Sequence, residues 1–204
     1  MMPDRESLDN SLSAVRSDVY TLLAHLLVQP PSADELKRLA NLTVLPVIPL
    51  SLEWHVARLR DAAVRIDAAS LKREYDDLFV GLGRGQVVPY ASWYEENLLM
   101  AAPLARLRTD LEALNLRRKE GVCEPEDHAG ALCEIMVLII ADARISFERQ
   151  ARFFKMHLAT WMVRFFRDVQ RAQSAAFYRS VGRLGEHFIL QEKRLLQRQW
   201  VEEV

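Results

Sequence analysis

Apolar residues recur at helical spacing along almost the whole chain, and this periodicity is the feature that most limits its possible folds. In the first segment they step by four and three residues through Leu8, Leu12, Val15, Val19, Leu22 and Leu26. That spacing puts them on one stripe of an amphipathic helix, which Pro30 and Pro31 end. No segment shows the alternating pattern with hairpin turns that is typical of strands. The sequence therefore predicts an all-α fold.

Later segments follow the same helical pattern, and their ends are predicted from local signals. Ser32 and Glu35 form a capping-box pattern, and Ser51 is expected to cap the next helix. A helix from Pro125 to about Phe147 is apolar on nearly every side, which is typical of a buried central helix. Its lone carboxylate, Glu134, is expected to need a partner or a polar cavity. Another helix is expected to run from Glu148 to about Gln170.

Size and charge restrict the classes of protein to which the chain can belong. Its 204 residues suit one packed domain, which we expect to span residues 1–204. A formal net charge of -1 does not favour nucleic-acid binding. The longest apolar stretch, Ile135 to Ala141, is far shorter than the roughly 20 residues of a membrane span, and the first residues lack a secretory signal pattern. Cys123 and Cys133 are expected to be free thiols, and the protein to be cytoplasmic.

The segment from Glu74 to Tyr94 departs most from this helical pattern. It holds three of the seven glycines, Gly81, Gly83 and Gly85, and then a cluster around Pro89: Tyr90, Ser92, Trp93 and Tyr94. Loops that combine glycines with large rings often carry function, so the segment is a candidate binding surface for an apolar or extended ligand. The glycine run lacks the Lys-Ser/Thr of a phosphate-binding loop. A nucleotide-binding or nucleotide-hydrolysing protein that uses residues 81–85 remains the alternative function.

A second unusual segment, Glu124-Pro125-Glu126-Asp127-His128, reads as the acidic start of a helix. His128 is not explained by helix initiation. No Glu-x-x-His, His-Glu-x-x-His or Cys-x-x-Cys pattern supports a metal site, and no local signature joins a nucleophile to a base. We predict neither an enzyme nor a cofactor. His25 and His157 lie on apolar helix faces and are expected to be core histidines.

These two segments together resemble the TorD/DmsD family of redox-enzyme maturation chaperones. The resemblance rests on Leu78-Phe79-Val80-Gly81, on Pro89-Tyr90-x-Ser92-x-Tyr94, and on Glu124 to His128 some thirty residues later. It extends to Tyr20 and Leu22 in the first helix and to Phe177-Tyr178-Arg179 near the end. The resemblance implies a single all-helical globular domain of the TorD/DmsD type.

The resemblance also implies a function. Members of the TorD/DmsD family bind the twin-arginine leader or the catalytic subunit of a molybdenum-cofactor enzyme in the cytoplasm before export. Carried over by motif, the peptide-binding candidates are Tyr75, Tyr90, Ser92, Trp93, Tyr94, Glu124, Pro125, Glu126, Asp127 and His128. Carboxylates among them would meet the leader's arginines, and the tyrosines would line its apolar stretch. The client would be a formate dehydrogenase or an S- or N-oxide reductase, and the chaperone a monomer or a dimer formed by exchange of helices.

Overall fold

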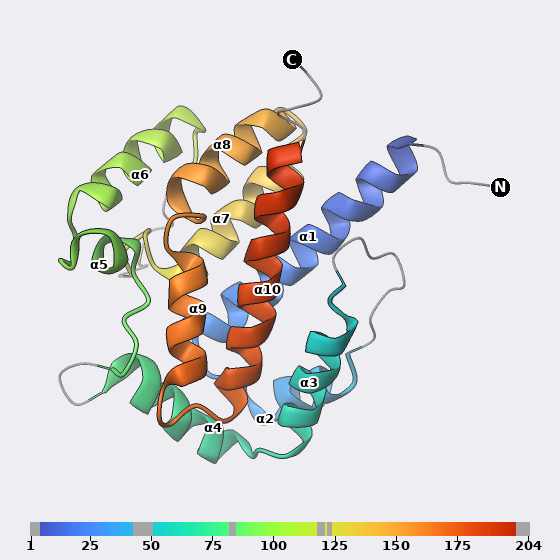
Figure 1. Cartoon of the computed structure of the whole chain (residues 1–204), viewed down its shortest axis with the longest axis vertical. Coiled ribbons are helices and arrows are strands. Elements are labelled where there is room, and N and C mark those ends of the chain that lie inside the picture. Colours follow the sequence, from blue (N-terminus) through green and yellow to red (C-terminus); the bar gives the residue numbers. More distant parts are fainter. Residues whose placement is uncertain (1–4, 43–50, 82–84, 118–120, 122–123, 199–204) are drawn as a thin grey trace.

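The computed structural model describes residues 5–42, 51–81, 85–117, 121 and 124–198 and is built of helices (Figure 1). In chain order the elements are α1 (Arg5–Val28), α2 (Ala33–Ala40), α3 (Glu53–Val64), α4 (Ala68–Tyr75), a π-helical turn (Asp76–Val80), α5 (Ala91–Glu96), α6 (Ala102–Ala113), α7 (Ala129–Ala141), α8 (Phe147–His157), α9 (Met162–Arg171) and α10 (Phe177–Arg198). Over these ranges the only strand-like pairing is a single bridge between Tyr90 and His128. The all-α prediction is confirmed.

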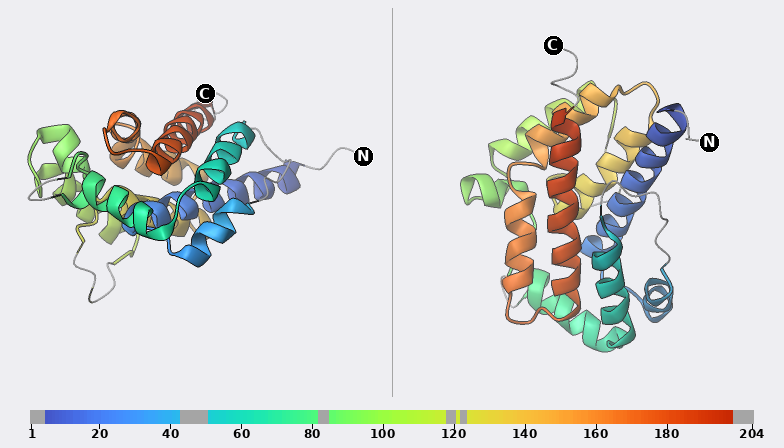
Figure 2. Two further views of the ribbon diagram at one scale, coloured as in Figure 1. Left: turned by 90° about the horizontal axis from the view of Figure 1, so that it is seen from below. Right: turned by 45° about the vertical axis from the view of Figure 1, so that its right-hand side comes forward.

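Two helix pairs form the body of the molecule: α1 lies along α7, and α9 lies along α10 (Figures 1 and 2). Around them, α3 packs on α10 and α2 packs on α3. One hydrophobic cluster runs through all of these helices, and its largest members are aromatic: Trp161, Tyr20, Tyr178, Phe154, Phe165, Phe166, Phe177 and Phe188.

A buried polar network joins α1, α8 and α10 inside this cluster. Arg16 donates to Glu192 at 2.8 Å and to Gln150 at 3.0 Å, and the Tyr20 hydroxyl donates to Glu192 at 3.1 Å. Arg16 and Glu192 are both fully buried. A charge inside a protein is tolerated only where a partner satisfies it, so this network fixes the relative positions of the three helices.

The start of α10 is held by a carboxylate from α4, which lies beside it although the two segments are about a hundred residues apart in the chain. Glu74, on α4, accepts hydrogen bonds from the backbone N–H groups of Ala176 (2.8 Å), Phe177 (3.1 Å) and Tyr178 (2.7 Å). These N–H groups have no partner within a helix, and the helix dipole favours a negative charge there. Glu74 therefore locks α4, and the turn that follows it, against α10.

Helix ends were predicted with mixed success. Ser32 and Glu35 make the expected capping box of α2. Ser51 does not cap α3: its own φ is 48°, and Leu52 occupies the capping position without a side-chain bond.

The helix predicted to run from Pro125 to Phe147 was too long at both ends. It begins at Ala129, because the backbone just before it pairs with the Tyr90 segment, and it ends at Ala141. Asp142 then accepts from the backbone N–H of Arg144 at 2.9 Å, which closes a turn before Ser146 caps α8.

The helix predicted from Glu148 to Gln170 is two helices, α8 and α9. Between them the indole of Trp161 donates to the carbonyl of His157 at 2.8 Å, and the Leu158 and Trp161 side chains turn into the core. His157 is buried as expected, and its Nε2 lies 2.7 Å from Asp110. The core prediction for His25 was wrong, since its side chain is 37% exposed and lies 2.9 Å from Glu35.

Candidate functional site

The structure brings together the two segments that stand out in the sequence. Tyr90 and His128 face each other in an antiparallel bridge. On either side of it, Ala91 N donates to Asp127 O at 3.0 Å, and Ala129 N donates to Pro89 O at 2.8 Å. Backbone hydrogen bonds thus join the glycine-aromatic segment, which leads into α5, to the acidic segment, which leads into α7.

A groove of about 680 Å³ opens beside this bridge. Its walls come from the end of α1, the π-helical turn, the bridge, the end of α6 with the residues after it, and one face of α7. It is lined by Val28, Tyr75, Phe79, Val80, Pro89, Tyr90, Leu111, Leu116, Arg117, Glu124, Glu126, His128, Ala131, Glu134, Ile135 and Leu138. Three of its apolar side chains are about half exposed: Val28 (46%), Val80 (58%) and Leu138 (53%). Apolar side chains gathered in an open groove are typical of a surface that binds a partner.

The α7 face of this groove corrects the prediction of a central helix buried all round. One side of α7 packs in the core, but Leu138 is exposed and Ile135 only partly covered, and both line the groove. Glu134 is exposed at the same surface, so it needs neither a buried partner nor a polar cavity. The helix is apolar all round because it serves the core on one side and the groove on the other. In the sequence, the groove floor is marked by a helix that is apolar on nearly every side and carries a single carboxylate, Glu134.

Carboxylates give the groove an acidic rim. Glu124, Glu126 and Glu134 line it, with Arg117 as the cation among its described lining residues. Glu124 accepts a hydrogen bond from the Tyr90 hydroxyl. Burial, and the charge of Asp127 nearby, raise the pKa of Glu124. Glu126 pairs with Arg108 at 2.9 Å.

Asp127 does not take the role expected for it. Its side chain is buried, with 1% of its surface exposed, and its Oδ2 accepts from the backbone N–H of Ser92 at 3.0 Å and from the Ser92 hydroxyl at 2.6 Å. Ser92 is also fully buried. A carboxylate so enclosed cannot meet an arginine on the surface, so Asp127 positions α5 instead.

His128 caps α7 from the edge of the groove. Its Nδ1 accepts from the backbone N–H of Gly130 at 3.1 Å, and its ring packs edge-on against Tyr90, with the ring centres 5.2 Å apart. Burial lowers the pKa of His128 to about 4, so the ring is neutral near pH 7. A neutral imidazole suits this cap, because a helix N-terminus carries a positive partial charge.

Tyr75 joins the groove to the end of α1. Its hydroxyl donates to the carbonyls of Leu27 at 3.1 Å and Val28 at 2.9 Å, which have no partner within the helix. Its ring packs on Phe79, with centres 5.1 Å apart. Burial, and the charge of Glu124, raise the pKa of Tyr75 to about 12. The ring therefore presents a neutral, fixed surface.

The remaining predicted residues lie outside the groove lining. The Tyr94 ring packs on Trp161, with centres 5.4 Å apart, and its hydroxyl donates to Asp168 at 2.9 Å, on the side of α9. Trp93 is half-buried on α5. Pro125 is half-buried, and its carbonyl accepts from His128 N at 3.1 Å.

Two glycines of the loop shape the bend beside the groove. Gly81 ends the π-helical turn with φ at 63°, and its N–H donates to Asp76 O at 2.7 Å. A Cβ on Gly85 would lie 2.4 Å from the Leu78 carbonyl oxygen, so a side chain would force the backbone apart. Backbone packing thus accounts for both glycines. Gly83 lies outside the described residues.

The described ranges contain no cluster of histidine, cysteine and carboxylate side chains that would hold a metal ion. None of the helices in these ranges combines the length and the apolar character needed to cross a membrane. Cys133 is buried, and burial raises the pKa of its thiol; Cys123 lies outside the described residues.

Known proteins resemble this chain in sequence and in fold. The family model described as nitrate reductase delta subunit matches residues 48–167. A chaperone protein TorD from Vibrio cholerae is 26% identical over 205 residues, covering 91% of this chain and 93% of that protein. The TorD of Aliivibrio fischeri is 26% identical and covers 81% of this chain. A crystal structure of a putative redox enzyme maturation protein from Archaeoglobus fulgidus aligns with a TM-score of 0.58 at 17% identity, over 85% of this chain and 93% of that one.

Proposed function

The chain belongs to the nitrate reductase delta subunit family, which includes the TorD chaperones for redox-enzyme maturation, and on that premise we propose that its groove binds the twin-arginine leader of a client redox enzyme. The chaperone would hold the client in the cytoplasm until its molybdenum cofactor is loaded. The client would be a formate dehydrogenase or an S- or N-oxide reductase.

The observation that carries this proposal is the chemistry of the groove. A leader of this kind has arginines followed by an apolar stretch. The half-exposed Val28, Val80 and Leu138 offer a surface for the apolar stretch. The rim carboxylates Glu124 and Glu134 offer charge-assisted hydrogen bonds to guanidinium groups. Asp127 and His128 contribute through the backbone they position, since their own polar atoms are engaged.

A change at the groove floor tests the proposal directly. Leu138→Gln removes an exposed apolar contact without touching the core, so we expect binding of a synthetic twin-arginine leader peptide to weaken about tenfold or more. Isothermal titration calorimetry with leaders from a formate dehydrogenase and from an N-oxide reductase measures the affinity and compares the two clients.

The matched control is Val64→Gln, which makes a similar change at an exposed residue, 71% accessible, on α3. This variant should bind the leader as the unchanged protein does. Equal losses in both variants, or no binding of either leader, would refute leader binding in this groove. If a leader-deleted catalytic subunit still co-purifies with the Leu138→Gln variant, that result assigns the subunit contact to a different surface.

A further inference from the structure

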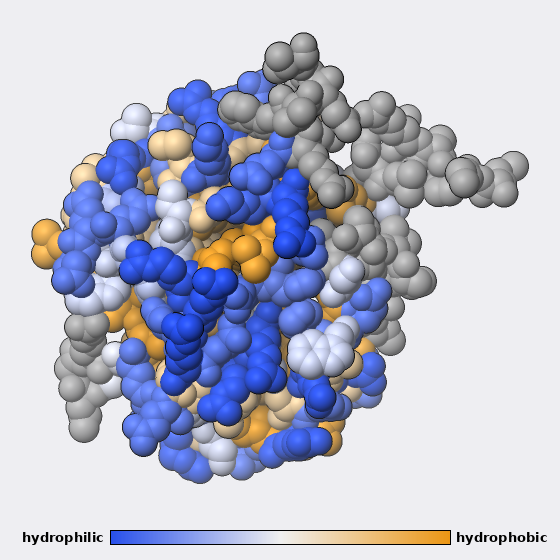
Figure 3. Space-filling view, viewed as in Figure 1, coloured by the Kyte–Doolittle hydropathy of each residue, from blue (hydrophilic) through white to orange (hydrophobic). Residues whose placement is uncertain are grey.

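A second hollow, of about 1020 Å³, lies away from the leader groove, where α8, α9 and α10 meet α5. Its floor is apolar, formed by Ala151, Phe154, Ala159 and Leu196. Met156 stands at its edge and is 47% exposed. Figure 3 shows the face that carries α9 and α10, with an apolar patch among hydrophilic side chains near its centre.

The rim of this hollow is basic, in contrast to that of the leader groove. Four basic side chains line it: Arg106, Lys155, Arg164 and Lys193. Among the described residues of the lining, Glu95 carries the carboxylate. An adjoining hollow of about 410 Å³ shares Lys155 and Met156 with it and adds Arg149, Arg152 and one carboxylate, Glu148. Helices α8 to α10 together carry eleven lysines and arginines and four acidic residues, in a chain whose net charge is -1.

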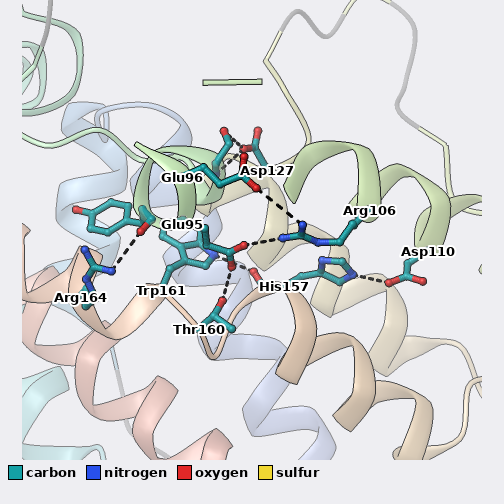
Figure 4. Close-up of polar contacts among 11 residues, drawn as sticks. Glu95, Glu96, Arg106, Asp110, Asp127, His157, Thr160, Trp161 and Arg164 are labelled. Atoms are coloured by element: carbon teal, nitrogen blue, oxygen red, sulfur yellow. Dashed lines mark hydrogen bonds and ion pairs between the residues drawn. The ribbon is translucent and has the colours of Figure 1, made fainter. Parts of the chain in front are cut away.

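Part of this positive charge is already matched within the protein. Glu95 lies between Arg106, at 2.9 Å, and the Thr160 hydroxyl, which donates to it at 2.6 Å (Figure 4). Arg164 donates to the Tyr94 carbonyl at 3.2 Å. Arg152 and Lys193, by contrast, have no ion-pair partner among the residues that the structure describes, and both are exposed. Their charges are available to a partner from outside.

We propose that this hollow is a second docking site, which receives an acidic segment of a partner protein that places an apolar side chain on the floor. The charge complementarity selects an acidic partner, because buried like charges are strongly unfavourable at an interface. The apolar floor selects a side chain that can insert, as in the anchor residues of protein interfaces.

The shape of the site favours a protein segment over other anionic partners. A recessed apolar floor cannot contact a flat membrane surface, whose lipids would reach only the rim. A nucleic acid would need basic side chains along an extended track, whereas here they surround a hollow.

Four labelled peptides of equal length test the proposal with the full chain. The first has a central phenylalanine flanked by glutamates and aspartates. The others replace the phenylalanine by serine, the acids by glutamines, or the acids by lysines. Fluorescence anisotropy should show binding of the first alone, and this binding should weaken as salt is added.

Charge reversal at the rim gives the decisive comparison. Arg152→Glu with Lys193→Glu should weaken binding of the acidic peptide about tenfold or more. Met156→Ser should weaken binding of the phenylalanine peptide, because it removes an apolar contact at the edge of the hollow. The matched control, Arg60→Glu with Arg65→Glu, makes the same charge change at exposed positions of α3 and just after it, and should bind normally.

Several results would overturn the proposal. They are failure of the acidic peptide to bind, equal binding of the lysine peptide, or equal losses in the rim and control variants. Binding of vesicles rich in phosphatidylglycerol that is lost in the rim variant, without peptide binding, would assign the surface to a membrane instead. The result is independent of the leader groove, because Glu124, Glu134 and Leu138 stay unchanged and leader binding is measured on the same samples.

Discussion

At the scale of single residues, the acidic motif divides into side chains that face the groove and side chains that build it. Glu124 and Glu126 line the groove, while Asp127 holds Ser92 and His128 caps α7. The family resemblance implied that Asp127 would meet the arginines of the leader. Asp127 is buried, and its carboxylate instead accepts hydrogen bonds from the backbone N–H and the hydroxyl of Ser92. Buried polar groups are usually hydrogen-bonded in this way.

The buried cap at His128 predicts a pH dependence of stability. The folded protein holds the pKa of His128 at about 4, below the ordinary value of 6.5. Between these values the unfolded chain binds the proton more readily, so the stabilisation is complete above about pH 6.5 and is lost as the pH falls toward 4. Within that window the free energy of unfolding should fall by up to about 1.4 kcal/mol per pH unit from this residue.

His128→Asn tests this prediction, because asparagine keeps a capping acceptor and does not titrate. Urea denaturation at a series of pH values should show a shallower slope for this variant. His25→Asn, at a more exposed histidine, should keep the full slope. An unchanged slope in the His128 variant would show that the proton binds elsewhere.

At the scale of elements, the close approach of α9 and α10 depends on small residues in α10. A Cβ on Gly182 would lie 2.8 Å from both the Phe166 carbonyl oxygen and the Gln170 Cγ, and one on Gly185 would lie 2.3 Å from the Phe166 ring. Glycine inside a helix is intrinsically unfavourable by about 1 kcal/mol relative to alanine. The contact between the helices is therefore the reason for both glycines.

Gly182→Ala tests which of these effects is larger. Helix propensity favours the alanine by about 1 kcal/mol, but the backbone oxygen of Phe166 cannot move without displacing α9. We expect a net loss of about 1–3 kcal/mol in the free energy of unfolding, measured by urea denaturation. Arg183→Ala, at the next and exposed position, should change stability by no more than about 0.5 kcal/mol. A Gly182 variant more stable than the unchanged protein would mean that the helices separate easily.

At the scale of the whole molecule, two surfaces of opposite charge lie on different sides of one core. The groove proposed to bind the leader opens beside the start of α7, and the basic hollow lies over α8 to α10. Viewed from below, α9 and α10 lie on one side and the segment leading into α7 on the other (Figure 2). The net charge of -1 conceals this asymmetry, because it sums over both surfaces.

The shared core predicts that residues 1–204 unfold as one unit. The hydrophobic cluster extends from α1 to α10, and Arg16, Gln150 and Glu192 tie three distant helices together. Circular dichroism and tryptophan fluorescence should therefore report one coincident thermal transition. Two separated transitions would show that the chain holds two independent domains.

Taken by itself, the sequence determined the helical class, the family and the two segments that meet at the groove. These rest on local properties: apolar spacing such as that of Leu12 and Val15, the capping box at Ser32, and the order of two motifs. Only the tertiary structure decided which side of α7 is exposed, that Asp127 is enclosed, and that the predicted helices end at Ala141 and His157. Each of these depends on contacts between residues far apart in the chain, and helical periodicity carries no information about which neighbour covers a given face.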